Sequence, residues 1–294
     1  MLRAIPHVAG EACFALKGGT AINLFVRDMP RLSVDIDLAY LPVDESRETT
    51  LKKMSDALGR IAASIKKAIQ GAKIQESRAE KPERVTRLIV ATGQARIKIE
   101  PNEVIRGSVF PAKERELTRR AEDLFELSVT AQTLSMADLY GGKLCAALDR
   151  QHPRDLFDVA VLLKHEGITD EIRKAFVVYL ASHDRPIHEL LDPTRKDVRR
   201  IYDNEFAGMP IEELAYEELI VAREAVIETL KKELTDDERT FLVSVKSGQP
   251  NWGVMGIEGI EKLPAIQWKL MNIRKISVKK RAELLDKLKR TLGW

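Results

Sequence analysis

Apolar and polar side chains alternate over residues 33–40, and this alternation predicts a β-strand. Because successive side chains of a strand point to opposite faces, Asp35 and Asp37 are expected to share one face, with the aliphatic residues on the other. Three more segments carry a strand signal, and the last two are joined through Gly93 and Gln94, which indicates a hairpin. These strands are expected at 12–16, 84–92 and 95–101.

The spacing of apolar residues predicts helices in most of the remaining chain. The clearest case is 47–70, where apolar residues recur at spacings of three and four. Ser135 is a good helix cap and predicts a helix that ends near Arg150, and Pro153 in the favoured first-turn position predicts the next one. Further helices are expected at about 170–182, 211–233, 236–246 and 278–291, with a connection at 247–264.

The strand signals all lie in the first half of the chain, whereas the second half is helical throughout. This distribution predicts an α+β chain, in which a domain with a sheet precedes an all-helical domain. We place the two domains at residues 1–165 and 166–294.

Composition narrows the class of protein. Hydrophobic residues make up 44% of the chain and charged residues 32%, as expected for a globular protein with a water-facing surface. The chain contains no run of about 18 apolar residues, the length that a membrane helix needs. Its first residues lack the features of a secretory signal. With only Cys13 and Cys145, a disulfide framework is not expected, so we expect a cytoplasmic protein without a membrane partner.

Charge is unevenly distributed although the net charge is only +3. Residues 203–238 contain twelve acidic and three basic side chains, and residues 266–294 contain nine basic and two acidic ones. This pattern indicates either internal docking of the basic segment or a surface for a polyanion. The basic residues singled out there are Lys269, Arg274, Lys275, Lys279, Lys280 and Arg281.

A glycine pair follows the first predicted strand. Gly18 and Gly19 let the backbone adopt positive φ and approach a ligand closely, and the N–H groups of a following helix can bind phosphate. Thr20 is expected to cap that helix or to donate its hydroxyl to a phosphate oxygen, and Lys17 adds positive charge. An ordinary strand-to-helix turn is the alternative interpretation.

The acidic pair is typical of a site for a hard divalent cation. Asp35 and Asp37 on one strand face can hold one or two Mg²⁺ (or Mn²⁺) ions through carboxylate oxygens. Lys98 and Glu100 alternate in the same way, so Glu100 would complete a carboxylate triad if its strand lies beside 33–40. The alternative is that both strands present ordinary water-facing charges.

Taken together, these motifs resemble the AbiEii/AbiGii toxin family of nucleotidyltransferases. The resemblance covers about residues 14–165 and rests on Leu16–Ala21, Arg31–Leu38, Lys98–Glu100, Lys143–Arg150 and Arg154–Asp158. It implies a polymerase-β-like nucleotidyltransferase core with a mixed sheet and flanking helices. It also implies a toxin of a type IV toxin–antitoxin or phage-abortive system, with a cognate antitoxin encoded nearby.

The resemblance gives roles to the second group of motifs. Lys143 is implied to contact the triphosphate, and Arg150, seven residues later on the same helix face, to help bind the nucleotide. Asp155 or Asp158 is implied to orient Lys143 or to assist the attacking hydroxyl, and we favour Asp158 because Asp155 has Arg154 as a neighbour. A set of surface salt bridges is the alternative.

The expected activity is transfer of a nucleoside monophosphate from a nucleoside triphosphate to an acceptor hydroxyl, with release of pyrophosphate. By resemblance the acceptor is the 3′ end of tRNA, and its modification would block translation. In this interpretation the catalytic residues are Asp35, Asp37, Lys143 and Asp158. A protein or small-molecule acceptor, or a toxin that binds GTP and RNA without turnover, are the alternatives.

Overall fold

The computed structural model describes residues 1–93 and 95–294, so Gln94 of the predicted hairpin connection lies outside the described residues. The chain divides into two compact units, Met1–Ser135 and Met136–Trp294. This division falls earlier than the predicted domain boundary near residue 165. It does so because the helices that follow Ser135 pack against later helices of the second unit.

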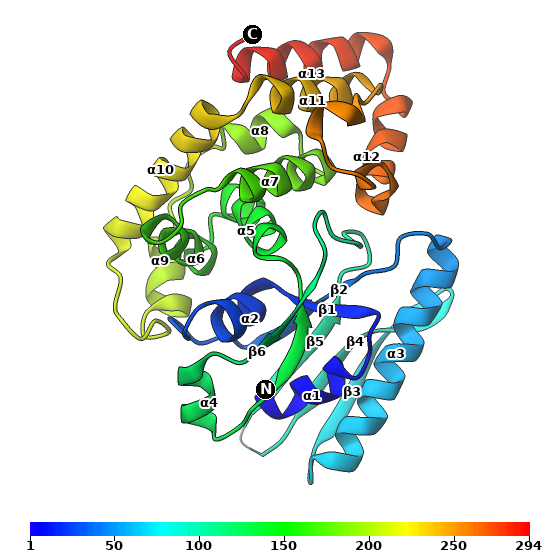
Figure 1. The fold of residues 1–294 in the computed structure, drawn as a ribbon, viewed down its shortest axis with the longest axis vertical. Helices are drawn as coiled ribbons and strands as arrows, with labels where there is room; N and C mark the ends of the chain where they lie inside the picture. Colours follow the sequence, from blue (N-terminus) through cyan, green and yellow to red (C-terminus); the bar gives the residue numbers. More distant parts are fainter. Residues whose placement is uncertain (94) are drawn as a thin grey trace. The chain divides into compact units, whose positions relative to one another are not determined.

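The first unit is built on a mixed seven-stranded sheet (Figure 1), with the strand order β3-β4-β5-β2-β1-β7-β6. The pairs β2–β5 and β1–β7 are parallel, and the other neighbouring strands are antiparallel. The strands are β1 (Phe14–Lys17), β2 (Asp35–Tyr40), β3 (Lys73–Glu80), β4 (Glu83–Ala91), β5 (Arg96–Pro101), β6 (Lys113–Glu116) and β7 (Thr130–Thr133).

Hydrophobic burial explains why the predicted strands and the long helix form where they do. In β2 the side chains of Ile36 and Leu38 are fully buried, whereas the alternating acids remain partly accessible. Helix α3 (Arg47–Ala68) begins at the Ser46 cap and packs its apolar face on β4. The helices of this unit are α1 (Ile5–Ala9), α2 (Gly18–Ala21), α3 and α4 (Arg119–Phe125).

The sequence did not reveal β3, β6 and β7. Strands β3 and β6 are the two edges of the sheet, and their side chains are mostly accessible, so they have no apolar alternation to detect. Their extended conformation is stabilised by backbone pairing with β4 and β7, which only the folded chain provides.

The second unit is helical, and residues 136–294, all of which are described, contain no strand. This confirms the α+β class and the helical second half. Compared with the predictions, the helix expected from 211 begins at Tyr216, and the helix at 264–275 was not predicted. The helices are α5 (Met136–Arg150), α6 (Pro153–Lys164), α7 (Asp170–Ser182), α8 (Ile187–Leu191), α9 (Arg199–Ile201), α10 (Tyr216–Glu233), α11 (Asp236–Ser247), α12 (Pro264–Lys275) and α13 (Val278–Thr291).

Short 3₁₀ and π turns complete the chain at Leu2–Ala4, Ile22–Val26, Tyr202–Phe206, Trp252–Met255 and Ile260–Lys262. Within the ranges 1–93 and 95–294, none of the helices combines the length and the apolar character required to span a bilayer.

Helix α5 approaches α7 closely at a glycine. A Cβ atom added at Gly141 would lie 2.8 Å from the backbone nitrogen of Phe176 and 2.9 Å from the carbonyl carbon of Ala175. A Cβ at the neighbouring Gly142 would meet nothing within 4 Å. Only the first of the two glycines is therefore required by packing.

This contrast makes a matched pair of variants. We expect Gly141→Ala to lower the free energy of unfolding by about 2 kcal/mol, because α5 and α7 must move apart. Gly142→Ala should raise it by up to about 1 kcal/mol, because alanine is the better helix former. Urea unfolding of both variants measures the difference, and equal effects would contradict the assigned close approach.

Candidate active site

The pairing of β2 with β5 brings the predicted acids together. The two strands are parallel neighbours, as expected for the triad, and Asp37 lies beside Glu100 in the register. Asp35 lies beside Lys98. Because alternate residues of a strand share a face, the three carboxylates and the Lys98 ammonium belong to one face of the sheet.

The glycine turn lies against this face. Strands β1 and β2 are antiparallel, with Lys17 opposite Asp37, so the chain turns into α2 directly beside that carboxylate. Gly18 has φ +68°, and a Cβ atom there would lie 2.7 Å from Oδ2 of Asp37. Only glycine provides both this backbone conformation and this clearance.

Thr20 does not cap the helix as expected. Helix α2 begins at Gly18, with Lys17 in the cap position, so Thr20 lies inside it and is buried. Its hydroxyl lies 2.9 Å from Oγ of Ser33 and donates to the carbonyl oxygen of Asp35. The hydroxyl thus ties the turn to the start of β2, and its contact with a phosphate stays a prediction.

Arg31 is a residue of this site that the sequence interpretation missed. Its guanidinium is buried beside the turn, with one terminal nitrogen 2.8 Å from the position that a Cβ of Gly19 would occupy. Its other terminal nitrogen donates to the carbonyl oxygen of Leu32 at 2.8 Å. Its place at the start of the Arg31–Leu38 motif was the available signal, but its position beside the turn depends on a chain reversal that sequence spacing does not show.

Cations surround the third carboxylate. The Nζ atom of Lys98 lies 3.1 Å from Oε2 of Glu100 and 3.7 Å from Oδ2 of Asp35. A terminal nitrogen of Arg87, on β4, lies 3.9 Å from Oε1 of Glu100. Burial alone would lower the pKa of Lys98, but the Glu100 hydrogen bond and the nearby acidic charges outweigh it and leave that pKa raised.

The donor chemistry of this face suits Mg²⁺ or Mn²⁺, which prefer carboxylate oxygens. In the parts of the chain that the structure describes, however, no three His, Cys, Asp or Glu side chains are grouped so that they could hold a metal ion. The ammonium of Lys98 contacts Asp35 and Glu100 instead. The carboxylates therefore fit a cation by their chemistry, but Asp35 and Glu100 would have to exchange Lys98 for it.

A second charged cluster lies in the second unit. Nζ of Lys143 lies 2.8 Å from Oδ1 of Asp155 and 3.0 Å from Oδ2 of Asp158. Arg150 places a terminal nitrogen 2.7 Å from Oδ2 of Asp155. The Lys143 and aspartate side chains are at most 8% exposed, whereas Arg150 is 62% exposed, so the alternative of surface salt bridges holds only for Arg150.

The cluster changes the interpretation of the two aspartates. Asp155 pairs with Lys143 and Arg150 rather than with its neighbour Arg154, so both aspartates orient the lysine. Burial alone would raise the pKa of Asp155, but the charges of Lys143 and Arg150 outweigh it and hold that pKa below its ordinary value of 3.8.

The profile of a known family covers most of the chain. The family described as "Nucleotidyl transferase AbiEii toxin, Type IV TA system" matches residues 1–272. This chain belongs to the AbiEii family. It is therefore a nucleotidyltransferase toxin of a type IV toxin–antitoxin system, which confirms the resemblance found in its motifs.

A solved structure shows the same fold at low sequence identity. MenT4, a nucleotidyltransferase toxin from Mycobacterium tuberculosis H37Rv, superposes with a TM-score of 0.60 at 14% identity. The similarity covers 98% of this chain and 89% of that one. A sequence comparison with curated proteins gives no significant match. The nucleotidyltransferase toxin fold thus extends through both units of the AbiEii chain.

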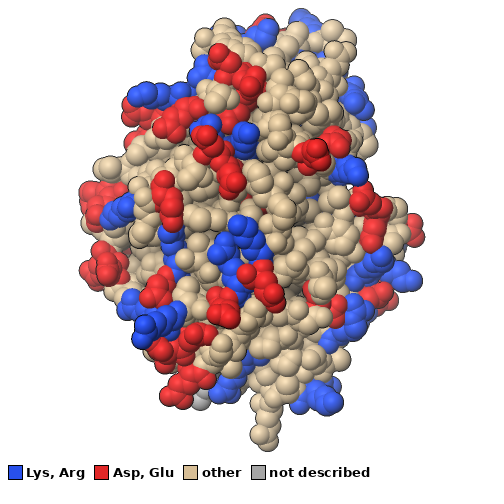
Figure 2. All heavy atoms as spheres, viewed as in Figure 1, with Lys and Arg blue, Asp and Glu red and all other residues tan. Residues whose placement is uncertain are grey.

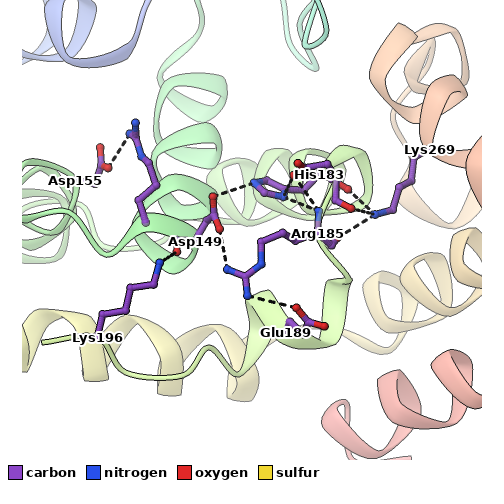
Figure 3. Close-up of polar contacts among 9 residues, drawn as sticks. Asp149, Asp155, His183, Arg185, Glu189, Lys196 and Lys269 are labelled. Atoms are coloured by element: carbon purple, nitrogen blue, oxygen red, sulfur yellow. Dashed lines mark hydrogen bonds and ion pairs between the residues drawn. The ribbon is translucent and has the colours of Figure 1, made fainter.

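The basic C-terminal segment of this AbiEii protein is only partly available to a ligand. Lys269 is buried, and its ammonium donates to the carbonyl oxygens of His183, Asp184 and Arg185 at 2.6, 3.1 and 2.9 Å (Figure 3). Burial lowers the pKa of Lys269 to about 8. Lys269 is therefore not available to a polyanion, because it binds the carbonyl oxygens that follow α7 instead.

The contact between the turn and Asp37 can be tested with two glycines of positive φ. Gly18→Ala should lower the free energy of unfolding by at least about 1 kcal/mol more than Gly71→Ala, because Gly71 has φ +76° with nothing within 4 Å. Thermal unfolding of both variants measures the difference. Equal losses would show that the Asp37 contact is not formed.

The buried cluster predicts a pH-dependent loss of stability. Because the pKa of Asp155 is lower in the folded than in the unfolded protein, its contribution is complete above about pH 3.8 and is lost as the pH falls through the folded value. Asp155→Asn should therefore cost about 3 kcal/mol at pH 7 and progressively less as the pH falls below 3.8 toward the folded pKa. Urea unfolding across this range measures it, and a cost independent of pH would refute the assignment.

Proposed function

We propose that this toxin transfers a nucleoside monophosphate from a nucleoside triphosphate to an acceptor hydroxyl at the face formed by β2 and β5. The observation that carries the proposal is the contact of the Gly18 turn with Asp37, beside Glu100 on the next strand. A turn that can bind phosphate and carboxylates that can bind a cation thus lie side by side.

Each candidate site residue of the first unit has a role in this proposal. The triphosphate lies along Gly18 and Gly19, where backbone N–H groups face it. Lys17 lies at the cap position of α2 and would contribute charge, and Thr20, inside the first turn of α2, would contribute its hydroxyl by exchanging its present partners for phosphate. When bound by Asp35, Asp37 and Glu100, one or two Mg²⁺ (or Mn²⁺) ions would neutralise phosphate charge and lower the pKa of the acceptor hydroxyl.

The reaction is an in-line displacement at the α-phosphorus. The acceptor hydroxyl loses its proton to solvent, its oxygen forms a bond to this phosphorus, the bond to the bridging oxygen of the β-phosphate breaks, and pyrophosphate leaves with its electron pair. For the second unit the proposal rests on the family motif, with Lys143 and Arg150 as nucleotide-binding residues and Asp158 as a catalytic one. Positioning and charge neutralisation supply most of the rate.

We further propose the 3′ end of tRNA as the acceptor, which would account for toxicity through blocked translation. The supports are the family resemblance and the exposed cations that remain in the basic segment. Of the basic residues singled out there, the exposed ones are Arg274, Lys275, Lys279 and Lys280. On the face drawn in Figure 2 acidic and basic side chains are interspersed, so phosphate contacts would be local.

The proposal predicts a labelled nucleic acid product. Purified protein incubated with each α-labelled nucleoside triphosphate, Mg²⁺ and bulk tRNA should lengthen and label the tRNA. Asp37→Asn should reduce the rate at least about a hundredfold, because the cation loses a ligand. Glu80→Gln, which removes an exposed carboxylate from the edge strand β3, is the matched control and should keep the wild-type rate.

The same assay with total cell lysate in place of tRNA offers RNA, protein and small molecules as acceptors at once, so it identifies the acceptor without assuming it. Label that migrates with protein or with a small molecule would overturn the tRNA assignment while leaving the transferase assignment intact. Toxicity that persists in a well-folded Asp37→Asn variant would contradict catalysis and favour a toxin that acts by binding.

A further inference from the structure

Lys98 lies where the proposed metal site would need room for a cation. Its ammonium contacts Glu100 at 3.1 Å and Asp35 at 3.7 Å, so it bridges two of the three carboxylates. The strand register requires this placement, because Lys98 lies beside Asp35 on the adjacent strand and shares its own strand face with Glu100.

The electrostatics of the face explain why a lysine is favourable there. Three carboxylates on neighbouring strands repel one another, and like charges directly opposite in a sheet are destabilising. The Lys98 and Glu100 side chains are 32% and 39% exposed, so water screens this repulsion only in part. An ammonium between two of the carboxylates relieves it without any metal ion.

A divalent cation would relieve the same repulsion more strongly. It would use the same carboxylate oxygens, and it would lie within a few ångströms of the ammonium if both stayed in place. Two cations that close repel each other. Lys98 and the metal ion are thus alternative partners of Asp35 and Glu100.

We propose that Lys98 is a resident counter-cation, which holds Asp35 and Glu100 together in the metal-free toxin and withdraws from between them when a divalent ion binds. This inference rests on the proposed metal-dependent transferase function. Lys98 is here a positioning residue, because it acts through the carboxylates. Its presence weakens binding of free metal, and the anionic triphosphate compensates for the added positive charge, so metal and nucleotide bind together.

A different role for Lys98 makes the opposite prediction. If the lysine served only to bind phosphate, removing it would weaken nucleotide binding and leave the affinity for free metal unchanged. If it served only to hold the strands together, removing it would disturb the site and weaken metal binding. The affinity for metal in the absence of nucleotide therefore separates the three roles.

The test is a titration of the full-length, nucleotide-free protein with Mn²⁺ at low ionic strength, followed by electron paramagnetic resonance of the free ion. We expect Lys98→Met to bind Mn²⁺ roughly tenfold more tightly than wild type, because a neighbouring positive charge is gone. Lys98→Arg keeps the charge and should bind like wild type. Arg96→Met removes an exposed charge from the same face of β5 and should change the affinity less than about threefold.

Thermal unfolding provides a second readout. Without metal, Lys98→Met should unfold at a lower temperature than Arg96→Met, because the carboxylates lose the cation that bridges them. Saturating Mn²⁺ should then raise its unfolding temperature more than it raises that of wild type, because tighter binding to the folded state stabilises it more. Asp37→Asn, introduced into wild type or into Lys98→Met, should abolish the rise in unfolding temperature that Mn²⁺ causes.

Two results would overturn the inference in different ways. If wild type binds Mn²⁺ through Asp37 and Lys98→Met binds it equally or more weakly, the counter-cation role is refuted and the proposed function stands. If wild type shows neither Mn²⁺ binding nor nucleotide transfer with Mg²⁺, the proposed function is refuted, and the inference with it.

Discussion

The register between β2 and β5 is the constraint on which the first unit of this toxin depends. A strand that slipped by one residue would turn its acids toward the core and its aliphatic side chains toward water. The full burial of Ile36 and Leu38 prevents that slip, so the apolar face of β2 fixes the position of Asp35 and Asp37 on the opposite face. The hydrophobic core and the candidate chemistry are thus two consequences of one alternation.

The charged side chains of the two units are neutralised in different surroundings, partly exposed in the first unit and buried in the second. On the sheet face the carboxylates remain partly accessible and are balanced by Lys98 and Arg87 at 3.1 to 3.9 Å. In the second unit Lys143 is removed from water and depends on direct contact with two aspartates. Breaking a buried ion pair costs more than breaking an exposed one, because desolvation leaves the remaining charge uncompensated. Loss of one partner should accordingly cost more in the buried helical cluster than on the partly exposed sheet face.

The elements that were predicted and the elements that were missed differ in where their stability comes from. Helix α3 and strand β2 carry their own periodic apolar faces, so local pattern was sufficient to find them. The edge strands β3 and β6 have no such pattern and depend on their pairing partners. The glycine turn was found because glycine pairs are conspicuous, but Thr20 was misplaced as a cap because the helix begins two residues earlier.

The amino-acid sequence by itself determined the α+β class, the family and the residues of both charged clusters except Arg87, because alternation, spacing and residue type are local properties. Only the tertiary structure decided that β5 lies beside β2, that Arg31 lies beside the glycine turn and that Lys269 is buried under three carbonyl oxygens. These contacts join segments that are distant in the chain. They follow from how the strands and helices pack, and that packing depends on the sum of many weak interactions rather than on any single motif.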